Sequence, residues 1–253
     1  MLHRQQLLSL LSELLQPGRI RDYCPNGLQV EGKPEIRRIV TGVTASQALV
    51  DAAIGWNADA ILVHHGYFWK NEASEITGMK KKRLQALLAN DINLFAYHLP
   101  LDIHPELGNN AQLGKLLNAE VITPIATVEP LGVVMQGEYA KSRSLSEVAT
   151  LLRQQLGRDM LVHAGVGNKP VRKLAWCTGG GQGYIEQAAA AGVDLFISGE
   201  VSEQTIHVSR ELDIHFIAAG HHATERYGIK ALGQYLAANY QLDVKFIDID
   251  NPA

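Results

Sequence analysis

The chain has 253 residues, of which 46% are hydrophobic and 19% charged, and its formal net charge is −3. These values are typical of a soluble globular protein with one large or two modest domains, and the charge gives no reason to expect nucleic acid or an anionic membrane as partner. The two cysteines, Cys24 and Cys177, are far apart, so we expect neither a disulfide scaffold nor a zinc ribbon, and we favour a reducing, cytoplasmic location.

Residues 1–15 predict an amphipathic helix rather than a signal peptide, because polar residues interrupt the leucines. No stretch approaches the ~20 apolar residues of a membrane span. Short runs of Val, Ile, Leu and Ala then alternate with helical patterns, which is typical of buried parallel strands in βαβ units. The predicted elements of this half are strands at 38–41, 60–63 and 94–97 and helices at 47–56, 79–90 and 110–117.

The middle of the chain has a different pattern. Residues 131–139 predict an exposed or edge strand, and 144–156 a helix that begins with a capping box of Ser144 and Glu147. The proline-containing segment 122–130 is the best candidate for a linker.

The α/β pattern restarts after residue 170, with strands at 171–176, 194–197 and 244–249 and helices at 184–191 and 224–239. Laid on the first half at an offset of 135 residues, it matches without a gap, so that Asp59 falls on Asp194 and His65 on Glu200. The identities are few, which leaves either an internal duplication or a chance similarity between two βαβ units.

These patterns predict an α/β fold with two similar halves, central mixed sheets flanked by helices, and a metal site in the cleft between the halves. The expected domains are residues 1–125 with 221–253, which carry most candidate ligands, and residues 126–220. The second domain would then be an insertion in the first.

Six of the ten histidines fall in three clusters, each of which begins where a strand-like run stops; the clusters are His64-His65, His98 with Asp102, and His221-His222 with Glu225. Imidazole and carboxylate groups together suit zinc, iron, manganese or nickel. Ligand pockets of open α/β sheets lie at the carboxyl ends of the strands. The three clusters therefore predict one metal site assembled from distant parts of the chain.

Each cluster also has a plainer interpretation. His221 and Glu225 share a helix face, as in an ordinary surface pair or cap. His64 and His65 would point to opposite sides of an extended chain, one buried and one exposed, unless Gly66 bends the chain. If they serve two neighbouring ions, Glu225 or Asp102 would bridge.

Within the second cluster Asp102 is the better ligand, whereas His98 would either bind metal directly or orient a ligand or a bound water. The glycine-rich turn at 178–183 would either hold a phosphate on its backbone amides or be a tight strand-to-helix turn. No nucleophile elbow occurs and no cysteine lies among the histidines, so nucleophilic catalysis by Ser or Cys is not supported.

Four motifs agree in order and spacing: Asn26–Gly32, Val63–Gly66, His98–Asp102 and Gly220–Glu225. Together they resemble the Nif-three-like family of dinuclear metal-centre proteins, whose members are often labelled type 2 homologues of GTP cyclohydrolase I. The resemblance covers nearly the whole chain and is greatest to the short bacterial members, which lack an extra inserted domain.

The resemblance implies two divalent metal ions per chain, with Glu225 as the bridge, and ligands carried over to His64, His65, Asp102, His221 and Glu225. His98 lies beside this set, as the candidate for moving protons. The resemblance also implies homohexamers, in the form of a toroid with metal sites facing an inner cavity.

Two functions are consistent with these features. One is a metal-dependent hydrolase that acts on a small nucleotide-like or phosphoester substrate. The alternative is a non-catalytic metal-binding ring, or a scaffold or regulatory protein. The family's own substrate is unsettled, so the resemblance does not decide between them.

Overall fold

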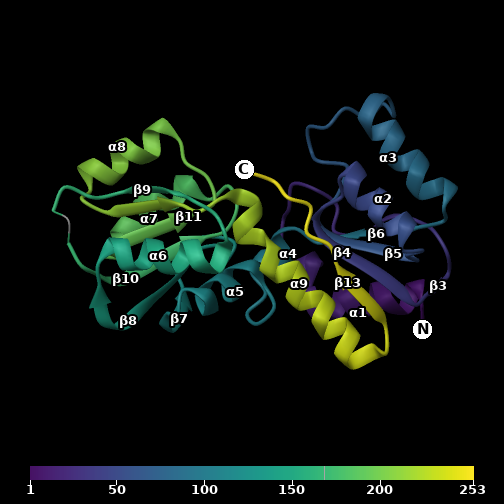
Figure 1. The fold of residues 1–253 in the computed structure, drawn as a ribbon, viewed down its shortest axis with the longest axis horizontal. Helices are drawn as coiled ribbons and strands as arrows, with labels where there is room; N and C mark the ends of the chain where they lie inside the picture. The colour runs from purple at the N-terminus through teal and green to yellow at the C-terminus, as the bar shows by residue number, and fades with distance from the viewer. Residues whose placement is uncertain (168) are drawn as a thin grey trace. The chain divides into compact units, whose positions relative to one another are not determined.

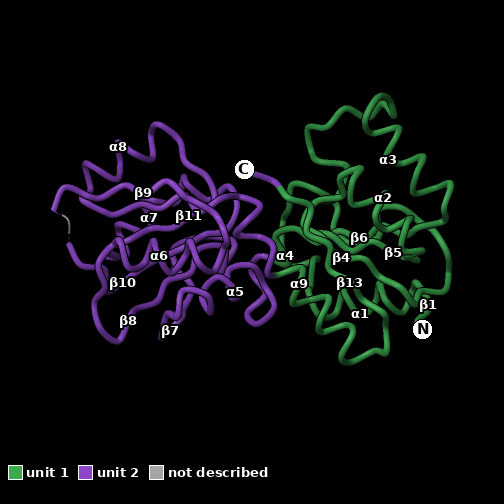
Figure 2. The backbone as a smooth tube through the Cα atoms, in the orientation of Figure 1, with its two compact units in different colours: residues 1–101, 228–250 green, residues 102–227, 251–253 purple. Residues whose placement is uncertain are grey.

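The computed structural model describes residues 1–167 and 169–253, which form two compact units (Figure 2). Unit 1 comprises residues 1–101 and 228–250, and unit 2 comprises residues 102–227 and 251–253. The division falls inside two helices, α4 (Leu99–Asp102) and α9 (His221–Tyr240). It differs from the predicted boundaries at 125 and 220, because residues 109–124 join the sheet and core of unit 2.

Unit 1 is built on a five-stranded sheet, in the order β13 (Asp243–Phe246), β4 (Arg38–Thr44), β5 (Ala60–His65), β6 (Asn93–Ala96) and β2 (Gly27–Val30). The first four strands are parallel and β2 is antiparallel, so the sheet is mixed as expected. Helices α2 (Gln47–Gly55) and α3 (Gly78–Ala89) cover one face, whereas α1 (Arg4–Leu15) and α9 lie on the other (Figure 1). A short ribbon of β1 (Leu2–His3) and β3 (Glu35–Ile36) and a turn of 3-10 helix, η1 (Pro17–Arg19), complete the unit.

Unit 2 is built on a six-stranded mixed sheet, in the order β7 (Glu120–Pro124), β8 (Met135–Arg143), β10 (Val171–Cys177), β11 (Leu195–Ser198), β12 (His215–Ala218) and β9 (Leu161–His163). Its helices are α5 (Asn109–Leu116), α6 (Leu145–Leu156), α7 (Ile185–Ala190) with the preceding η2 (Gln182–Tyr184), and α8 (Glu203–Glu211).

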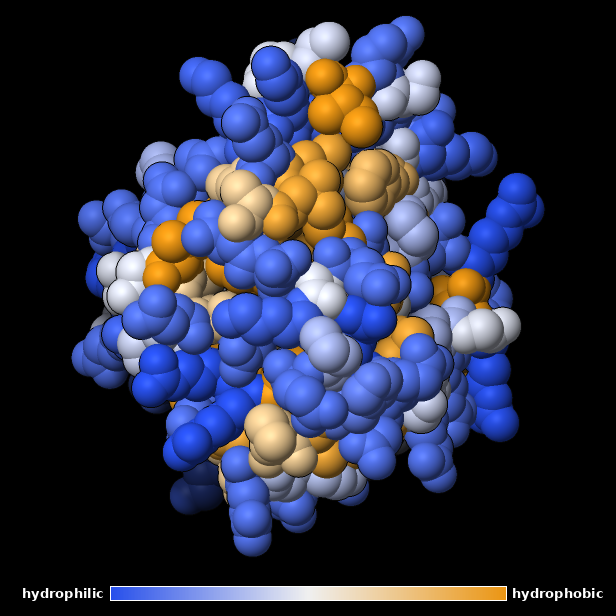
Figure 3. All heavy atoms as spheres, turned by 90° about the vertical axis from the view of Figure 1, so that its right-hand side faces the viewer, coloured by the Kyte–Doolittle hydropathy of each residue, from blue (hydrophilic) through white to orange (hydrophobic). Residues whose placement is uncertain are grey.

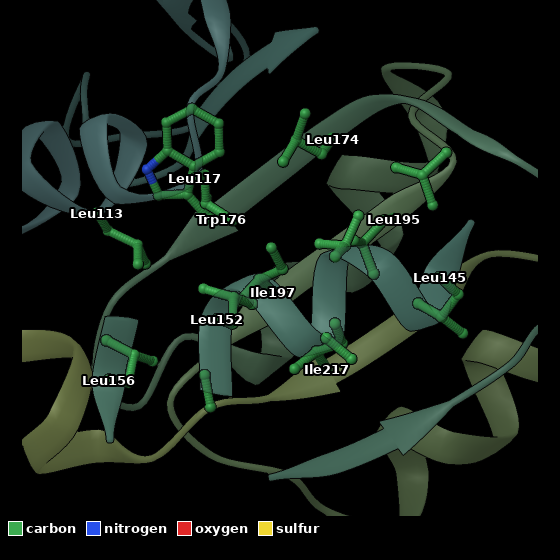
Figure 4. Close-up of a cluster of buried hydrophobic side chains, with 14 of the residues drawn as sticks. Leu113, Leu117, Leu145, Leu152, Leu156, Leu174, Trp176, Leu195, Ile197 and Ile217 are labelled. Carbon is green, nitrogen blue, oxygen red and sulfur yellow. The ribbon is translucent and has the colours of Figure 1, made fainter. Parts of the chain in front are cut away.

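Alternate residues of the central strands in unit 2 face different helices. Leu174, Trp176 and Ile197 pack with leucines of α5 and α6 in one core (Figure 4). Ala175 and Phe196 pack with residues of α7 and α8 in a second core. Burial on both sides explains why these strands read as continuous apolar runs in the sequence.

Two expectations about the middle segment were wrong. The strand predicted at 131–139 is not at an edge, because β8 pairs with β10 on one side and β7 on the other. The predicted linker at 122–130 overlaps β7, which is the true edge strand and exposes Val121. Pro124 is compatible with β7 because proline is tolerated at an edge, where a missing N–H breaks no ladder.

The two sheets share a four-strand arrangement, β4-β5-β6-β2 in unit 1 and β10-β11-β12-β9 in unit 2. The register is also shared: Ile39 pairs with Ala60, and Leu174, 135 residues further on, pairs with Leu195. Asp59 accepts two consecutive backbone N–H groups, of residues 37 and 38, and Asp194 accepts those of 172 and 173. This agreement supports internal duplication over chance similarity.

Among the residues that the structure describes, no helix is both long and apolar enough to cross a membrane. On the face that Figure 3 shows, hydrophobic residues form separate patches among hydrophilic ones.

Candidate metal centre

His64 and His65 are the last two residues of β5, and their rings lie 4.5 Å apart. The His64 side chain is fully buried, and its Nδ1 lies 3.1 Å from the carbonyl oxygen of Tyr97. Because a carbonyl only accepts hydrogen bonds, Nδ1 carries the proton, and in the neutral ring Nε2 holds the lone pair. His65 places its Nδ1 3.2 Å from the Thr44 hydroxyl on the neighbouring strand β4.

The bend after His65 requires a glycine. A Cβ at Gly66 would overlap the side-chain oxygen of Gln29. The Gln29 side chain is hydrogen-bonded to both backbone groups of Tyr67, the residue after Gly66. Its Oε1 accepts from Tyr67 N at 2.7 Å, and its Nε2 donates to Tyr67 O at 3.1 Å. The structure thus explains how the chain bends so that both histidines belong to one group of potential ligands.

His98 follows β6 and is held by the loop before β2. Its Nδ1 lies 2.7 Å from Asp22 Oδ1, and its backbone N–H donates to Asn26 Oδ1 at 2.7 Å. Burial alone would raise the pKa of Asp22, but hydrogen bonds from His98, Asn26 and a backbone N–H, together with the His98 charge, hold that pKa below its usual value. The carboxylate accepts, so the Nδ1 proton stays on His98 and Nε2 remains for a ligand or a proton.

Ring nitrogens of His64, His65 and His98 all lie within 4.8 Å of one another, close enough to hold one metal ion. Asp22, Cys24 and His98 form a second group of this kind. That group is a poor metal site, because Asp22 already accepts four hydrogen bonds. Burial and the charge of Asp22 also raise the pKa of the Cys24 thiol to about 12, which keeps it protonated at neutral pH.

In unit 2, Asp102 and Glu225 are both buried, and a carboxylate oxygen of each lies within 4.8 Å of the other. Asp102 Oδ1 accepts from Asn109 Nδ2 at 2.9 Å, and the Thr178 hydroxyl is 3.4 Å away. Burial, followed by the charges of these two carboxylates, raises the pKa of the Cys177 thiol well above its usual value. Like charges this close are costly unless a cation offsets them, which is a property of carboxylates that bind metal.

His221 is the first residue of α9 and lies between two carboxylates. Its Nδ1 is 2.7 Å from Glu200 Oε1, and its Nε2 is 3.2 Å from Glu225 Oε2. Burial on its own would lower the pKa of His221, but the hydrogen bonds and charges of Glu225 and Glu200 raise it to about 9. The two carboxylates thus favour positive charge beside Glu225, which a divalent cation would also supply.

The glycine-rich turn packs against these ligands. Gly179 has a φ of +64°, and a Cβ there would overlap Glu225 Oε1 and lie 3.2 Å from His221 Nε2. Its N–H donates to the Thr224 hydroxyl at 3.0 Å, and its carbonyl accepts from Gly199 N at 2.9 Å. At Gly179 the structure therefore favours the tight-turn interpretation over a phosphate site.

The structure gathers the predicted site residues in two sets, His64, His65 and His98 in unit 1 and Asp102, His221 and Glu225 in unit 2. In each of the four histidines Nδ1 is hydrogen-bonded within its own unit, which directs Nε2 to any ligand. Four other histidines have local structural partners: His3, His104, His163 and His215.

The sequence analysis missed Asp22, Asn26 and Gln29 as supports of the histidines. Asn26 and Gln29 lie in the Asn26–Gly32 motif of the family resemblance, to which no role in the site was assigned. Glu200 was predicted only as the residue that matches His65 and, with His207, as a side chain that would line a cleft shared by the two halves.

The chain is an α/β protein with two mixed β-sheets and a candidate metal centre of histidines and carboxylates. Comparison with known sequences identifies the family to which such a protein belongs. Residues 2–252 match the Duf34/NIF3 (NGG1p interacting factor 3) family, and the chain therefore belongs to this family. The suspected family is thereby confirmed.

Similar proteins are known from several bacteria. The chain is 60% identical over 248 residues to the "GTP cyclohydrolase 1 type 2 homolog" of Yersinia pestis and 57% identical over 248 residues to that of Escherichia coli K12, covering 98% of each sequence. Among solved structures it resembles protein ybgI, of unknown function, with 55% identity, a TM-score of 0.95 and full coverage of both chains. The protein TTHA1606 from Thermus thermophilus is 34% identical, with a TM-score of 0.90 and full coverage of both chains.

Proposed function

We propose that this protein is a metal-dependent hydrolase with a dinuclear centre, acting on a small nucleotide-like or phosphoester substrate. The ions would be held by His64, His65, Asp102, His221 and Glu225. Glu225 would be the bridging ligand. One observation carries the proposal: each ligand histidine has its Nδ1 held by a partner in its own unit, which is how proteins orient metal-binding imidazoles.

The proposed ligand side chains fit a pair of divalent transition-metal ions. Three imidazoles and two carboxylates suit zinc, iron, manganese or nickel, and the buried carboxylate pair in unit 2 favours a cation. When bound, two such ions would lower the pKa of a coordinated water toward neutrality and stabilise developing negative charge.

His98 would move the protons. Asp22 holds its Nδ1 proton in place, so Nε2 is the atom that accepts a proton and returns it. The rings of Trp69 and Tyr23 lie 5.0 and 6.3 Å from the His98 ring, and the His98 side chain is 14% exposed. The name carried by the bacterial relatives supports a nucleotide-like substrate.

The test has two parts. Elemental analysis of metal-supplied protein should give about two transition-metal ions per chain, as in bridged hydrolytic sites. A plateau at one ion that is unchanged in Glu225→Ala would refute the bridged pair.

A metal-supplemented activity screen over nucleotides, phosphodiesters and peptides should then find hydrolysis that Asp102→Ala abolishes. Full metal loading without turnover on any substrate would instead support the non-catalytic ring or scaffold. Assembly as a homohexamer belongs to the same proposal and rests on the family resemblance, whereas the proposed cytoplasmic location rests on the two isolated cysteines.

A further inference from the structure

We infer that Glu200 is a positioning residue of the metal centre: its carboxylate holds His221 in the tautomer and orientation that present Nε2 to the metal. This inference rests on the proposed function, because it takes His221 as a ligand. Nothing in the comparisons assigns a role to Glu200.

The contact is short and directional. Glu200 Oε1 lies 2.7 Å from His221 Nδ1, and an ionised carboxylate can only accept, so the proton between them belongs to Nδ1. The opposite nitrogen of the ring, Nε2, faces Glu225 at 3.2 Å, which is the carboxylate proposed to bridge the ions. A ring fixed at Nδ1 can therefore turn only its Nε2 toward the centre.

Glu200 is itself held in place. Its second oxygen accepts from Gln182 Nε2 at 3.3 Å, from the helical turn that follows the glycine-rich segment. Both carboxylate oxygens thus have partners, which is the arrangement of a carboxylate that orients a metal-binding histidine.

The internal repeat gives the position further meaning. Val63 and Ser198 occupy equivalent register positions on β5 and β11, and two residues further along lie His65 and Glu200. The same position of the repeat thus holds the proposed ligand His65 in unit 1. In unit 2 it holds Glu200, which accepts a hydrogen bond from the proposed ligand His221 on α9.

The side chain of Glu200 is 46% exposed, and exposed ion pairs add little to folding stability. A change at this position should therefore act on the metal and leave the fold intact. Loss of such a partner lowers metal affinity by about 10–100-fold in comparable sites.

The experiment measures Zn²⁺ affinity of the full chain by competition with a chromophoric chelator. Glu200→Ala should bind zinc about 10–100-fold more weakly, whereas Glu200→Gln, whose amide oxygen still accepts from Nδ1, should recover most of the loss. Glu203→Ala removes an exposed carboxylate three residues away and should bind like the wild type. Co²⁺-loaded Glu200→Ala should also show altered visible bands, because the ligand geometry changes.

The outcomes separate the two proposals. If His221→Ala keeps full zinc affinity, the ligand set itself is wrong. If His221→Ala loses zinc but Glu200→Ala binds like the wild type, only the positioning role is refuted. Equal losses in Glu200→Ala and Glu200→Gln would also refute it, because the charge and not the hydrogen bond would then matter. Should Glu200→Ala fail to fold, Gln182→Ala must show a smaller loss of affinity than His221→Ala, and wild-type affinity would contradict the inference.

Discussion

Four histidines of the candidate site, His64, His65, His98 and His221, are each hydrogen-bonded at Nδ1, but the bonding partner differs. Nδ1 meets a carbonyl at His64, a hydroxyl at His65 and a carboxylate at both His98 and His221. A carboxylate partner makes the opposite nitrogen more basic than a carbonyl does. His221 is therefore the strongest imidazole donor expected among the proposed ligands.

Replacing the proposed ligands should remove metal without unfolding the chain. His65→Ala and Asp102→Ala should both lower metal content and any hydrolysis, because these residues lie at the ends of elements and not within the apolar core. His98→Ala is informative in a different way: if His98 supports the site, the change should cost about 10–100-fold in affinity or activity and leave some metal bound. If His98 binds metal directly, His98→Ala should behave like His65→Ala.

Metal content by elemental analysis, with circular dichroism as the check on folding, decides between these outcomes. His3→Ala and His163→Ala are the matched controls, since both rings have partners away from the ligands. Full metal content in both His65→Ala and Asp102→Ala would show that the site assignment is wrong.

Replacing Gly179 should affect both the backbone conformation of the turn and the position of Glu225. Gly179→Ala places a Cβ at a φ of +64° and against Glu225, so metal content should fall. Thermal or urea unfolding should show a loss of about 1–2 kcal/mol from the left-handed conformation alone. Gly183→Ala, in the same turn, meets nothing within 4 Å and should leave the metal content unchanged. Retention of full metal content by Gly179→Ala would mean that Glu225 can move aside freely.

At the scale of elements, one carboxylate anchors the start of β4. Asp59 Oδ2 accepts from the N–H groups of Arg37 and Arg38, at 3.0 and 2.9 Å. Burial alone would raise the pKa of Asp59, but these two backbone donors and Lys33 hold it below its usual value. A pKa that folding lowers adds stability above the unfolded value, and that stability is lost as the pH falls through the folded value.

Asp59→Asn should therefore destabilise the protein at pH 7 by about 1 kcal/mol, the scale of one hydrogen bond. The difference from wild type should shrink as the pH falls below ~4, where the unfolded chain is protonated first and the folded chain follows at its lower pKa. Urea unfolding at several pH values measures it, with the exposed Glu75→Gln as control. A pH-independent difference would show that the charge of Asp59 plays no part.

The sequence predicted most elements because their signals are local. Apolar runs located β4, β5, β10 and β11, and the capping box of Ser144 and Glu147 located the start of α6, where both hydrogen bonds form. The edge strand β7 was missed because its proline favoured a linker, and its pairing with β8 depends on a distant segment.

The candidate site could be predicted from the sequence only as far as its signals are local. Ligand-type residues at strand ends are visible in the sequence, whereas the residues that hold them are not. Asp22 and His98 are 76 positions apart and Glu200 and His221 are 21 apart, so only the folded chain reveals the pairs. The two units of the structure differ from the predicted domains for a related reason, because the division between the units falls within helices and not at a proline-rich segment.

At the scale of the whole molecule, assembly is the main prediction. Light scattering should give a mass near six chains, as the family resemblance implies. The sheet of unit 2 has two edge strands, β7 and β9, and β7, with Val121 71% exposed, is the edge that we expect to pair. Val121→Lys should weaken association, with the exposed Val166→Lys as control. A monomer at micromolar concentration in the unmodified protein would contradict the prediction.

The three tryptophans of this chain stand in unlike surroundings. Trp176 is fully buried and donates to Asn110 O at 2.8 Å, Trp56 lies beneath the guanidinium of Arg38, and Trp69 lies 5.8 and 5.0 Å from the rings of His65 and His98. Their fluorescence is therefore a set of built-in optical reporters. A paramagnetic ion such as Co²⁺ bound at His65 and His98 should quench the emission of Trp69, so occupancy could be followed in an unlabelled protein.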